Sequence, residues 1–234
     1  MARGAHNWLV SRNHDEAIRG AVAAHARGRL IDIGCGEKPY ASITKEFVTE
    51  HVGVDHRDSL HGSRNVDLDS TAYDIPVPDG SFDSALCTAV LEHLEEPERA
   101  IREAFRVLRP GGKAIYTVPL FWHLHEEPRD FFRFTKFGLR YLFEKVGFEV
   151  LELRPLSGIW VTLGQMLAYH LGVFDSGVVH KIRLMVPLYA LVQAGALLLD
   201  KIDRAEQWTW AYLLVAQKPE TRLPSPPLVN ENSK

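Results

Sequence analysis

The stretch from Arg29 to Tyr40 reads RLIDIGCGEKPY: an apolar run, a turn with two glycines and the start of a helix. The apolar run has the length and the branched residues of a strand buried on both faces. Gly34 and Gly36 let the backbone come close to a ligand, and the following helix would point free N–H groups at it. Asp55 ends a second apolar run about 20 residues further on, where its carboxylate could accept both hydroxyls of a ribose. We therefore predict a site for an adenosine-containing cofactor.

Further apolar runs alternate with amphipathic stretches along the chain. This alternation is typical of a parallel sheet with helices on both faces, and it predicts an α/β, Rossmann-like doubly wound fold. One stretch, 97–108, predicts a helix with Glu103 and Arg106 facing outward. Another, after Thr135, predicts a helix that ends at Gly147. The expected strands are 29–33, 51–55, 65–68, 81–87, 113–118, 148–153 and 208–217.

The chain is expected to be one elaborated domain with additions at both ends. A helix over 13–26 should cover the cofactor crevice, with Trp8 reaching the pocket. The last segment contains four prolines and has little apolar pattern, so burial cannot offset the entropy lost on ordering it. The expected segments are an N-terminal helical cap (1–28), the cofactor-binding core (29–155), a helical insertion (156–205), the last strand of the core (206–217) and a disordered tail (218–234).

The insertion contains the most apolar piece of the chain, LMVPLYALVQAGALLL over 184–199. This piece is interrupted by Pro187 and Gln193, and it is shorter than the ~20 residues needed to span a bilayer. We expect a buried helix that packs on the sheet or across a homodimer. The alternative is a patch that lies on a membrane surface, next to a lipid-linked substrate.

Composition and charge exclude several classes of protein. Hydrophobic residues make up 46% of the 234 residues and charged residues 24%, which is ordinary for a globular chain. A net charge of −3 gives no basic surface for gripping a phosphate backbone, so we expect no nucleic-acid partner. Two cysteines are too few for a disulfide scaffold, and the first residues lack the apolar core of a secretory signal. We therefore expect a cytoplasmic protein, with a position at the membrane periphery as the variant.

The type of cofactor depends on Pro39. The pyrophosphate-binding fingerprint of dinucleotide enzymes requires a third glycine three residues after Gly36, and this chain has proline there. An NAD-dependent oxidoreductase is therefore a disfavoured alternative.

Five motifs follow one another along the chain: DIGCG over 32–36, Asp55, PVPDGSFD over 76–83, LEHL over 91–94 and LRPGG over 108–112. In this order they resemble the class I S-adenosylmethionine-dependent methyltransferases, and several ordered motifs are more specific than one glycine turn. The resemblance implies a seven-stranded, mostly parallel sheet with a reversed last strand. It also implies S-adenosylmethionine as the cofactor.

The resemblance assigns cofactor contacts to four strand ends. The methionine end would lie against the glycine turn, the ribose against the acid after the second strand, the adenine against the acid after the third, and the sulfonium beside the fourth. For the adenine the sequence offers Asp67 and Asp69, and we favour Asp67 with the backbone of Leu68. The implied residues are, in that order, Asp32, Gly34, Cys35 and Gly36; Asp55; Asp67 and Leu68; and Cys87.

The loop over 118–135, VPLFWHLHEEPRDFFRFT, combines aromatic, histidine and charged side chains. Loops at the carboxyl ends of parallel strands face the ligand crevice, so we expect the acceptor here. We expect His125 to be the general base or the anchor of the acceptor, because histidine titrates near neutral pH. The alternative is that His125 and Asp130 only order the loop. Substrate contacts are also expected from Trp122, His123, Asp130 and Arg133.

The expected activity is methylation of a small-molecule acceptor at an oxygen atom, by in-line displacement. The segment His-x-x-Pro-x-Asp-Phe-x-Arg from His125 is similar to one in methyltransferases of polysaccharide and natural-product pathways, so a sugar, a lipid-linked intermediate or a natural-product intermediate is the expected acceptor. The spacing of His123, His125 and Glu126 does not match a metal site, so we expect no metal. The alternative is a non-catalytic S-adenosylmethionine-binding or membrane-associated scaffold with the same fold.

Overall fold

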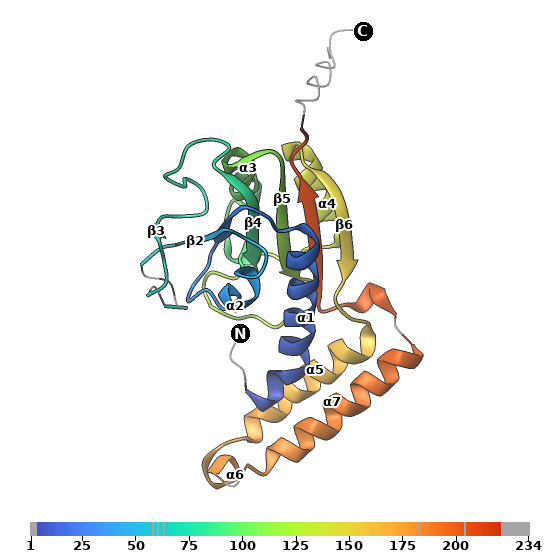
Figure 1. Ribbon diagram of the computed structural model, residues 1–234. Coiled ribbons are helices and arrows are strands. Elements are labelled where there is room, and N and C mark those ends of the chain that lie inside the picture. Colours follow the sequence, from blue (N-terminus) through green and yellow to red (C-terminus); the bar gives the residue numbers. More distant parts are fainter. Residues whose placement is uncertain are drawn as a thin grey trace, which may run out of the picture.

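The computed structural model describes residues 4–220, except 58, 60, 63, 182 and 204 and the side chain of residue 178. Seven strands form one sheet in the order β3-β2-β1-β4-β5-β7-β6, in which β7 runs antiparallel to both neighbours (Figure 1). The predicted α/β, Rossmann-like doubly wound sheet with a reversed last strand is confirmed. The strands are β1 (Arg29–Ile33), β2 (Glu50–Asp55), β3 (Leu68–Asp69), β4 (Phe82–Thr88), β5 (Leu108–Pro119), β6 (Glu149–Pro155) and β7 (Ala211–Gln217).

Helices cover both faces of the sheet, because successive side chains of each strand point to opposite sides. Leu30, Leu86 and Ile115 belong to the core under α1, whereas their neighbours Ile31 and Ala85 belong to the core under α3 and α4. In Figure 1, α1 lies in front of the sheet and α3 and α4 lie behind it. These layers contain α1 (Trp8–His25), α2 (Ala41–Thr44), α3 (Pro97–Val107) and α4 (Lys136–Val146), with the short helices η1 (Ala5–Asn7) and η2 (Leu91–His93).

Helix α4 begins and ends as predicted. Oγ1 of Thr135 accepts a hydrogen bond from Gly138 N at 3.1 Å, and Gly147 adopts φ +112 directly after the helix. These are the usual N-cap and left-handed C′ positions. Helix α4 therefore follows the acceptor loop at a fixed point, Thr135.

The expected outward position of two α3 residues is wrong. Glu103 is buried, and its Oε1 accepts a hydrogen bond from Ile75 N at 2.6 Å. Arg106 donates to the carbonyl oxygens of Val77 and Ile75, both at 2.8 Å. No helix covers the described segment between β3 and β4, and these two side chains attach that segment to α3 instead.

Several boundaries also differ from the prediction, among them those of β3 and of the last segment. β3 contains Leu68–Asp69, further along the chain than the expected 65–68. Lys218, expected to begin the disordered tail, donates from its backbone N to Gly112 O at 2.9 Å and from Nζ to Leu108 O at 2.6 Å. The core therefore includes Lys218, and positions 221–234 of the expected tail lie outside the described residues.

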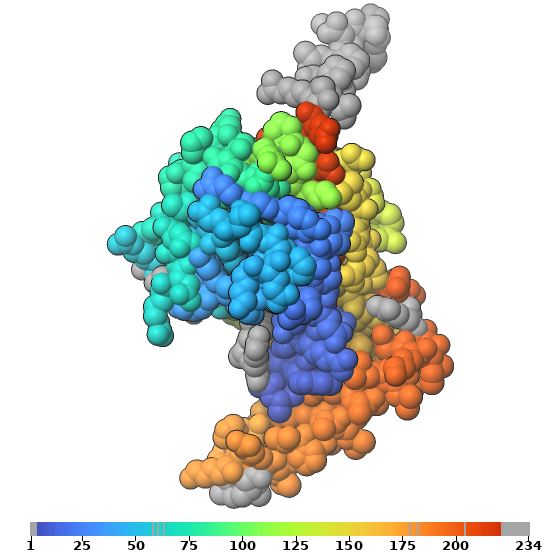
Figure 2. All heavy atoms as spheres, viewed as in Figure 1, coloured from blue at the N-terminus to red at the C-terminus, as the bar shows by residue number. Residues whose placement is uncertain are grey.

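The insertion between β6 and β7 forms a hairpin of α5 and α7 that projects beyond the sheet (Figures 1 and 2). The two helices pack closely, since a Cβ at Gly164 would lie 2.6 Å from Cβ of Ala196. The insertion contains α5 (Ile159–Leu171), η3 (Gly172–Phe174), α6 (Gly177–Lys181) and α7 (Met185–Ile202), followed by η4 (Glu206–Trp208).

The expectation that 184–199 packs on the sheet is wrong. Leu191, Leu198 and Ile202 of α7 are 70%, 62% and 77% exposed. By length and composition, α7 is long and apolar enough to cross a membrane. Packing across a homodimer stays a prediction.

Candidate functional site

The glycine turn after β1 is fixed by backbone hydrogen bonds and a close contact. Gly34 N and Cys35 N both donate to Val54 O, at 2.9 and 3.1 Å. Gly34 adopts φ +72, and a Cβ there would lie 2.4 Å from Cγ2 of Val90 in the loop after β4. Glycine is therefore required for the ends of β1 and β4 to approach each other.

Asp55 lies at the carboxyl end of β2 and holds the same turn with its side chain. Oδ2 accepts a hydrogen bond from Gly36 N and Oδ1 accepts one from His56 N, both at 2.8 Å. Each oxygen keeps a further lone pair, so the carboxylate can still accept ribose hydroxyls. Asp55 has the predicted position, and its contact with a ribose stays a prediction.

The predicted helix directly after the turn is absent. Helix α2 begins only at Ala41 and is four residues long. The amides of Gly34, Cys35 and Gly36 are bound to Val54 and Asp55, so they offer no free N–H groups. A cofactor at this turn would be recognised by carboxylates and by the shape of the backbone.

The carboxylate of Asp67 is held by two partners, Gly53 and Lys38. Oδ2 accepts a hydrogen bond from Gly53 N at 2.6 Å and pairs with Nζ of Lys38. The register of β3 on β2 places Asp69 opposite Asp55, where both strands end. The carboxylate of Asp69 has partners of its own, since Oδ2 lies 2.6 Å from Nε of Arg57, and the adenine contact of Asp67 or Asp69 stays a prediction.

Asp32 and the two cysteines are buried beneath the crevice. Asp32 is 2% exposed, and its Oδ2 lies 3.0 Å from Nε2 of His51. Burial raises the pKa of Cys35 to about 12 and the pKa of Cys87 well above its usual value. Both thiols therefore stay protonated, and any cofactor contact at these cysteines falls to the backbone.

A small pocket opens at the ends of β4, β5 and β7. It is lined by Trp122 and His125, whose contact with an acceptor stays a prediction, and by His14, Glu92 and Trp210, to which the sequence assigned no contact there; His123, Asp130 and Arg133 do not line it. Its wall is completed by Ala89, Thr117, Val118, Pro119 and Ala211. Because Ala89 precedes Val90, the pocket adjoins the glycine turn.

His14 reaches this pocket from α1. Its Nε2 lies 2.8 Å from Thr117 Oγ1 and its Nδ1 lies 2.9 Å from the Tyr40 hydroxyl. Burial lowers the pKa of His14 to about 3, so the ring is neutral at pH 7. A signal was present in the sequence: His14 follows Val10 and precedes Ile18 at a spacing of four residues, on the apolar stripe of the helix.

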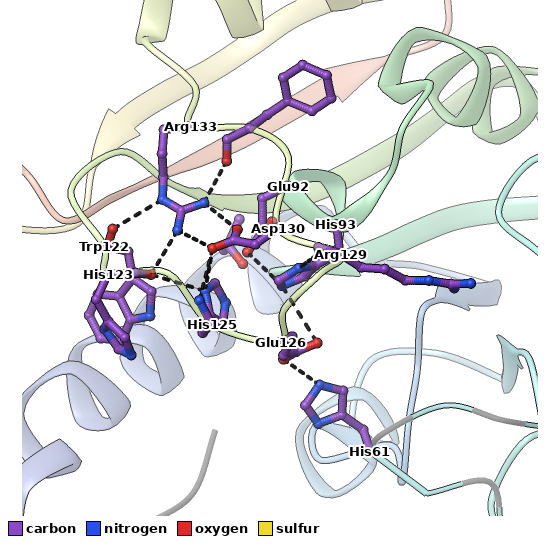
Figure 3. A network of polar contacts seen from close by, with 12 residues as sticks. His61, Glu92, His93, Trp122, His123, His125, Glu126, Arg129, Asp130 and Arg133 are labelled. Carbon is purple, nitrogen blue, oxygen red and sulfur yellow. Dashed lines mark hydrogen bonds and ion pairs between the residues drawn. The ribbon is translucent and has the colours of Figure 1, made fainter.

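His125 is oriented by Asp130 and Arg133 (Figure 3). Its Nδ1 lies 3.4 Å from Asp130 Oδ2 and 3.3 Å from the carbonyl oxygen of His123. Both neighbours are acceptors, so Nδ1 carries the proton and Nε2 keeps the lone pair. Arg133 donates to both oxygens of Asp130, at 2.6 and 2.8 Å, and this holds the pKa of Asp130 well below its usual range. Burial, followed by the nearby His93, lowers the pKa of His125, so its ring is neutral at pH 7.

Glu92 and His93 of the LEHL motif lie beside His125. Glu92 is 1% exposed, and neither oxygen of its carboxylate accepts a hydrogen bond from another described residue. Burial raises the pKa of Glu92 to about 8. Nδ1 of His93 lies 2.6 Å from Arg129 O, and the His93 ring meets the His125 ring edge-on with centroids 4.6 Å apart. Glu92 and His125 line the pocket, and His93 lies directly behind His125.

The loops after β2 and β5 meet across the outer edge of the crevice. Nε2 of His61 lies 2.8 Å from Oε1 of Glu126 (Figure 3). This hydrogen bond raises the pKa of His61 and lowers the pKa of Glu126. His61 also lies against the turn, because a Cβ at Gly36 would be 2.9 Å from Cβ of His61.

The insertion contributes an aromatic side chain to the acceptor loop. The ring centroid of Tyr169 in α5 lies 4.4 Å from that of His123 and 5.4 Å from that of Trp122. Trp8 does not reach the pocket: its side chain is 48% exposed and lies 5.5 Å from the guanidinium of Arg12. The N-terminal helix therefore contributes His14 to the pocket instead of Trp8, and Tyr169 of α5 lies against the acceptor loop.

Residues 31–116 match the methyltransferase domain family. One relative is the tRNA (carboxymethyluridine(34)-5-O)-methyltransferase ALKBH8 of Macaca fascicularis, 36% identical over 105 residues, which are 42% of this chain and 15% of that protein. Another is the 2-methyl-6-phytyl-1,4-hydroquinone methyltransferase 1, chloroplastic, of Oryza sativa subsp. japonica, 26% identical over 167 residues, which are 62% of this chain and 48% of that protein. The chain spans less than half the length of each.

A solved S-adenosylmethionine-dependent methyltransferase of Thermotoga maritima has the same fold. It superimposes with a TM-score of 0.51 at 29% identity, over 63% of this chain and 76% of that one. The domain match contains the glycine turn, Asp55, Asp69 and Glu92, and it ends at residue 116. The acceptor loop and the insertion lie outside it.

Proposed function

Because this chain belongs to the class I S-adenosylmethionine-dependent methyltransferases, we propose that it methylates a hydroxyl oxygen of a small-molecule acceptor. The observation that carries this proposal is the neutral His125, whose Nδ1 faces Asp130 while its other nitrogen is free to take a proton. It lies in a pocket at the carboxyl ends of parallel strands, where ligands of such folds bind.

The described residues fit the cofactor in kind. The turn has two glycines with positive φ at the ends of β1 and β2, and it lies beside the carboxylate of Asp55. Asp55 would take the ribose hydroxyls, and Asp69 would lie beside the adenine. When bound, S-adenosylmethionine supplies an electrophilic methyl group on a sulfonium.

The chain's own residues prepare the acceptor. Nε2 of His125 accepts the hydroxyl proton, or anchors the acceptor oxygen, and Asp130 stabilises the imidazolium that forms. Trp122 and Trp210 give the pocket an apolar wall that limits water. A phenol or quinol suits such a wall, and the hydroquinone methyltransferase among the relatives supports this acceptor class.

The test is transfer of labelled methyl groups from S-adenosylmethionine to a panel of phenols, quinols and sugars, with bulk tRNA alongside. We expect a methylated hydroxyl compound as product. His125→Ala should lower turnover by about 10²- to 10⁴-fold and leave the affinity for S-adenosylhomocysteine unchanged. His170→Ala, an exposed histidine on α5, is the matched control. Methylation of tRNA instead would overturn the acceptor class, and cofactor binding without any turnover would favour the scaffold alternative.

We propose further that the α5–α7 hairpin places the protein at a membrane surface, where a lipid-linked acceptor would be found. Support comes from the exposed apolar side chains of both helices, among them Leu163 and Met166 of α5 and Leu191 of α7. The full chain should co-sediment with vesicles of phosphatidylcholine and phosphatidylglycerol, and Leu191→Ser with Leu198→Ser should abolish this. A stable dimer that ignores vesicles would contradict the proposal and support the predicted homodimer.

A further inference from the structure

We propose that Glu92, His93 and His125 bind one divalent transition-metal cation at the edge of the acceptor pocket. Each residue offers one ligand atom, and these atoms all lie within 4.8 Å of one another (Figure 3). Two imidazoles and one carboxylate, with a position left open, are the donor set of many catalytic zinc sites. Imidazole ligands favour zinc, iron or nickel over magnesium and calcium. This revises the expectation that the chain has no metal site.

The surroundings of the Glu92 carboxylate favour a bound cation. Its side chain is almost completely buried, yet both carboxylate oxygens lack a hydrogen-bond donor among the other described residues. Arg133 is a cation near Glu92, but it does not donate a hydrogen bond to Glu92. It donates to both oxygens of Asp130 instead. A buried carboxylate without a partner is costly, whereas a carboxylate that coordinates a cation is not.

The orientation of the His93 ring leaves Nε2 available to bind a cation. Arg129 O can only accept a hydrogen bond, so the His93 Nδ1 atom 2.6 Å away carries the proton. The lone pair of the neutral ring is then on Nε2, which has no hydrogen-bond partner among the described residues. This atom lies 3.9 Å from Oε1 of Glu92 and 3.8 Å from Oε2 of Glu126. Electron-rich atoms thus face one another around a small volume, and a cation there would stabilise all of them.

The hydrogen-bond partners of His93 and His125 are those of metal-binding histidines. Histidines that bind metals usually donate their other N–H to a carboxylate or a backbone carbonyl, which fixes the ring and the tautomer. His93 has this contact with Arg129 O, and His125 has it with Asp130 and the carbonyl oxygen of His123. Both rings therefore keep Nε2 as the ligand atom.

Binding would draw the ligand atoms, which lie within 4.8 Å of one another, closer together. Donor atoms around a tetrahedral zinc ion lie about 3.4 Å apart, given Zn–N distances near 2.1 Å. The 3.9 Å between Glu92 and His93 would shrink by roughly 0.5 Å. Glu126 lies at a similar distance from His93 and could serve as a fourth ligand or as an outer partner.

The metal's role in methyl transfer rests on the proposed function, whereas metal binding itself does not. An acceptor hydroxyl in the open position would lose its proton more easily, as metal-bound water does. His125 would then anchor the acceptor through the cation, the second of its two proposed roles.

The experiment titrates Zn²⁺ into the full chain, freed of metal by chelation, and follows binding by calorimetry. Co²⁺ serves as a second probe, because its visible spectrum reports nitrogen and oxygen ligands. We expect one equivalent to bind. In Glu92→Gln, His93→Ala and His125→Ala, binding should weaken by more than about 100-fold, since loss of an outer partner alone costs 10- to 100-fold. His170→Ala should bind as the parent does.

S-adenosylhomocysteine is titrated into the same proteins to separate the two proposals. Retained cofactor binding without Zn²⁺ binding would overturn the metal site and leave the proposed function standing. Zn²⁺ affinity that is unchanged in His93→Ala would place the ion elsewhere and would also overturn it. If Glu92→Gln fails to fold, His93→Ala still tests the metal site, because the side chain of His93 is partly exposed.

Discussion

His14 and Thr117 are 103 residues apart in the sequence, and their side chains meet at 2.8 Å in the wall of the acceptor pocket. Because both ring nitrogens of His14 have partners and the ring is buried, it must stay neutral in the folded chain. The contact joins α1 to the carboxyl end of β5. The stability of the folded chain therefore depends on whether the His14 ring binds a proton.

The first prediction concerns this pH dependence. The folded pKa of His14, about 3, lies below its unfolded value near 6.5, so the unfolded chain binds the proton first. Its contribution is fully present above pH 6.5 and is lost as the pH falls toward 3. His14→Gln should remove roughly 2 to 3 kcal/mol of the drop in unfolding free energy between pH 7 and pH 4.5. Urea unfolding of both proteins at the two pH values measures this, and parallel pH dependences would contradict it.

The second prediction separates two aspartates. Asp55→Ala removes the carboxylate at the end of β2 and should weaken S-adenosylhomocysteine binding by about 10- to 100-fold, which corresponds to 1.5–3 kcal/mol. Asp69→Ala should also weaken binding, because Asp69 lies beside Asp55. The control is Asp67→Asn, since that side chain faces Lys38 and Gly53. A larger effect at Asp67 than at Asp69 would support Asp67 as the adenine contact.

The third prediction concerns the glycine turn. In Gly34→Ala the new Cβ would lie 2.4 Å from Val90 at φ +72, so cofactor binding and stability should both fall. Gly20→Ala on α1 is the control, because no described atom lies within 4 Å of a Cβ there. It should stabilise the chain by about 0.5–1 kcal/mol. Thermal unfolding with and without S-adenosylhomocysteine measures both effects, and a Gly34→Ala protein that behaves as the parent does would contradict the close approach.

The fourth prediction concerns the segment between β3 and β4. Arg106→Ala leaves the carbonyl oxygens of Ile75 and Val77 without this donor, and unfolding free energy should fall by about 2–3 kcal/mol. Arg102→Ala breaks an exposed pair with Glu98 on the same helix and should cost at most about 0.5 kcal/mol. Equal losses in the two variants would show that Arg106 holds nothing beyond its own helix.

The sequence predicted the parts of the molecule whose geometry is local. The turn at Gly34 and Gly36, the acid at Asp55 and the cap at Thr135 each follow from short spacings, and the strand order follows from the resemblance. The choice between Asp67 and Asp69 was harder, because β3 is only two residues long and Asp67 pairs with Lys38, far away in the chain.

Other features depend on burial, which single-sequence patterns report poorly. Composition gives Glu103 and Arg106 the appearance of solvent-facing residues, although Glu103 is buried against Ile75. The composition of an apolar segment such as 184–199 is the same whether the segment packs on the sheet or lies on the outside of the protein. Glu92 belongs to the LEHL motif. Only the three-dimensional structure shows that its carboxylate has no hydrogen-bond donor among the other described residues.

A crystal structure of the full chain with S-adenosylhomocysteine tests the central claim most directly. The account predicts density over the glycine turn, with the ribose hydroxyls on Asp55 and the adenine beside Asp69. The sulfur should point toward the pocket of Trp122 and His125. Density for the ligand at another place, or a turn that stays closed beneath Val90 and His61 at saturating ligand, would contradict it.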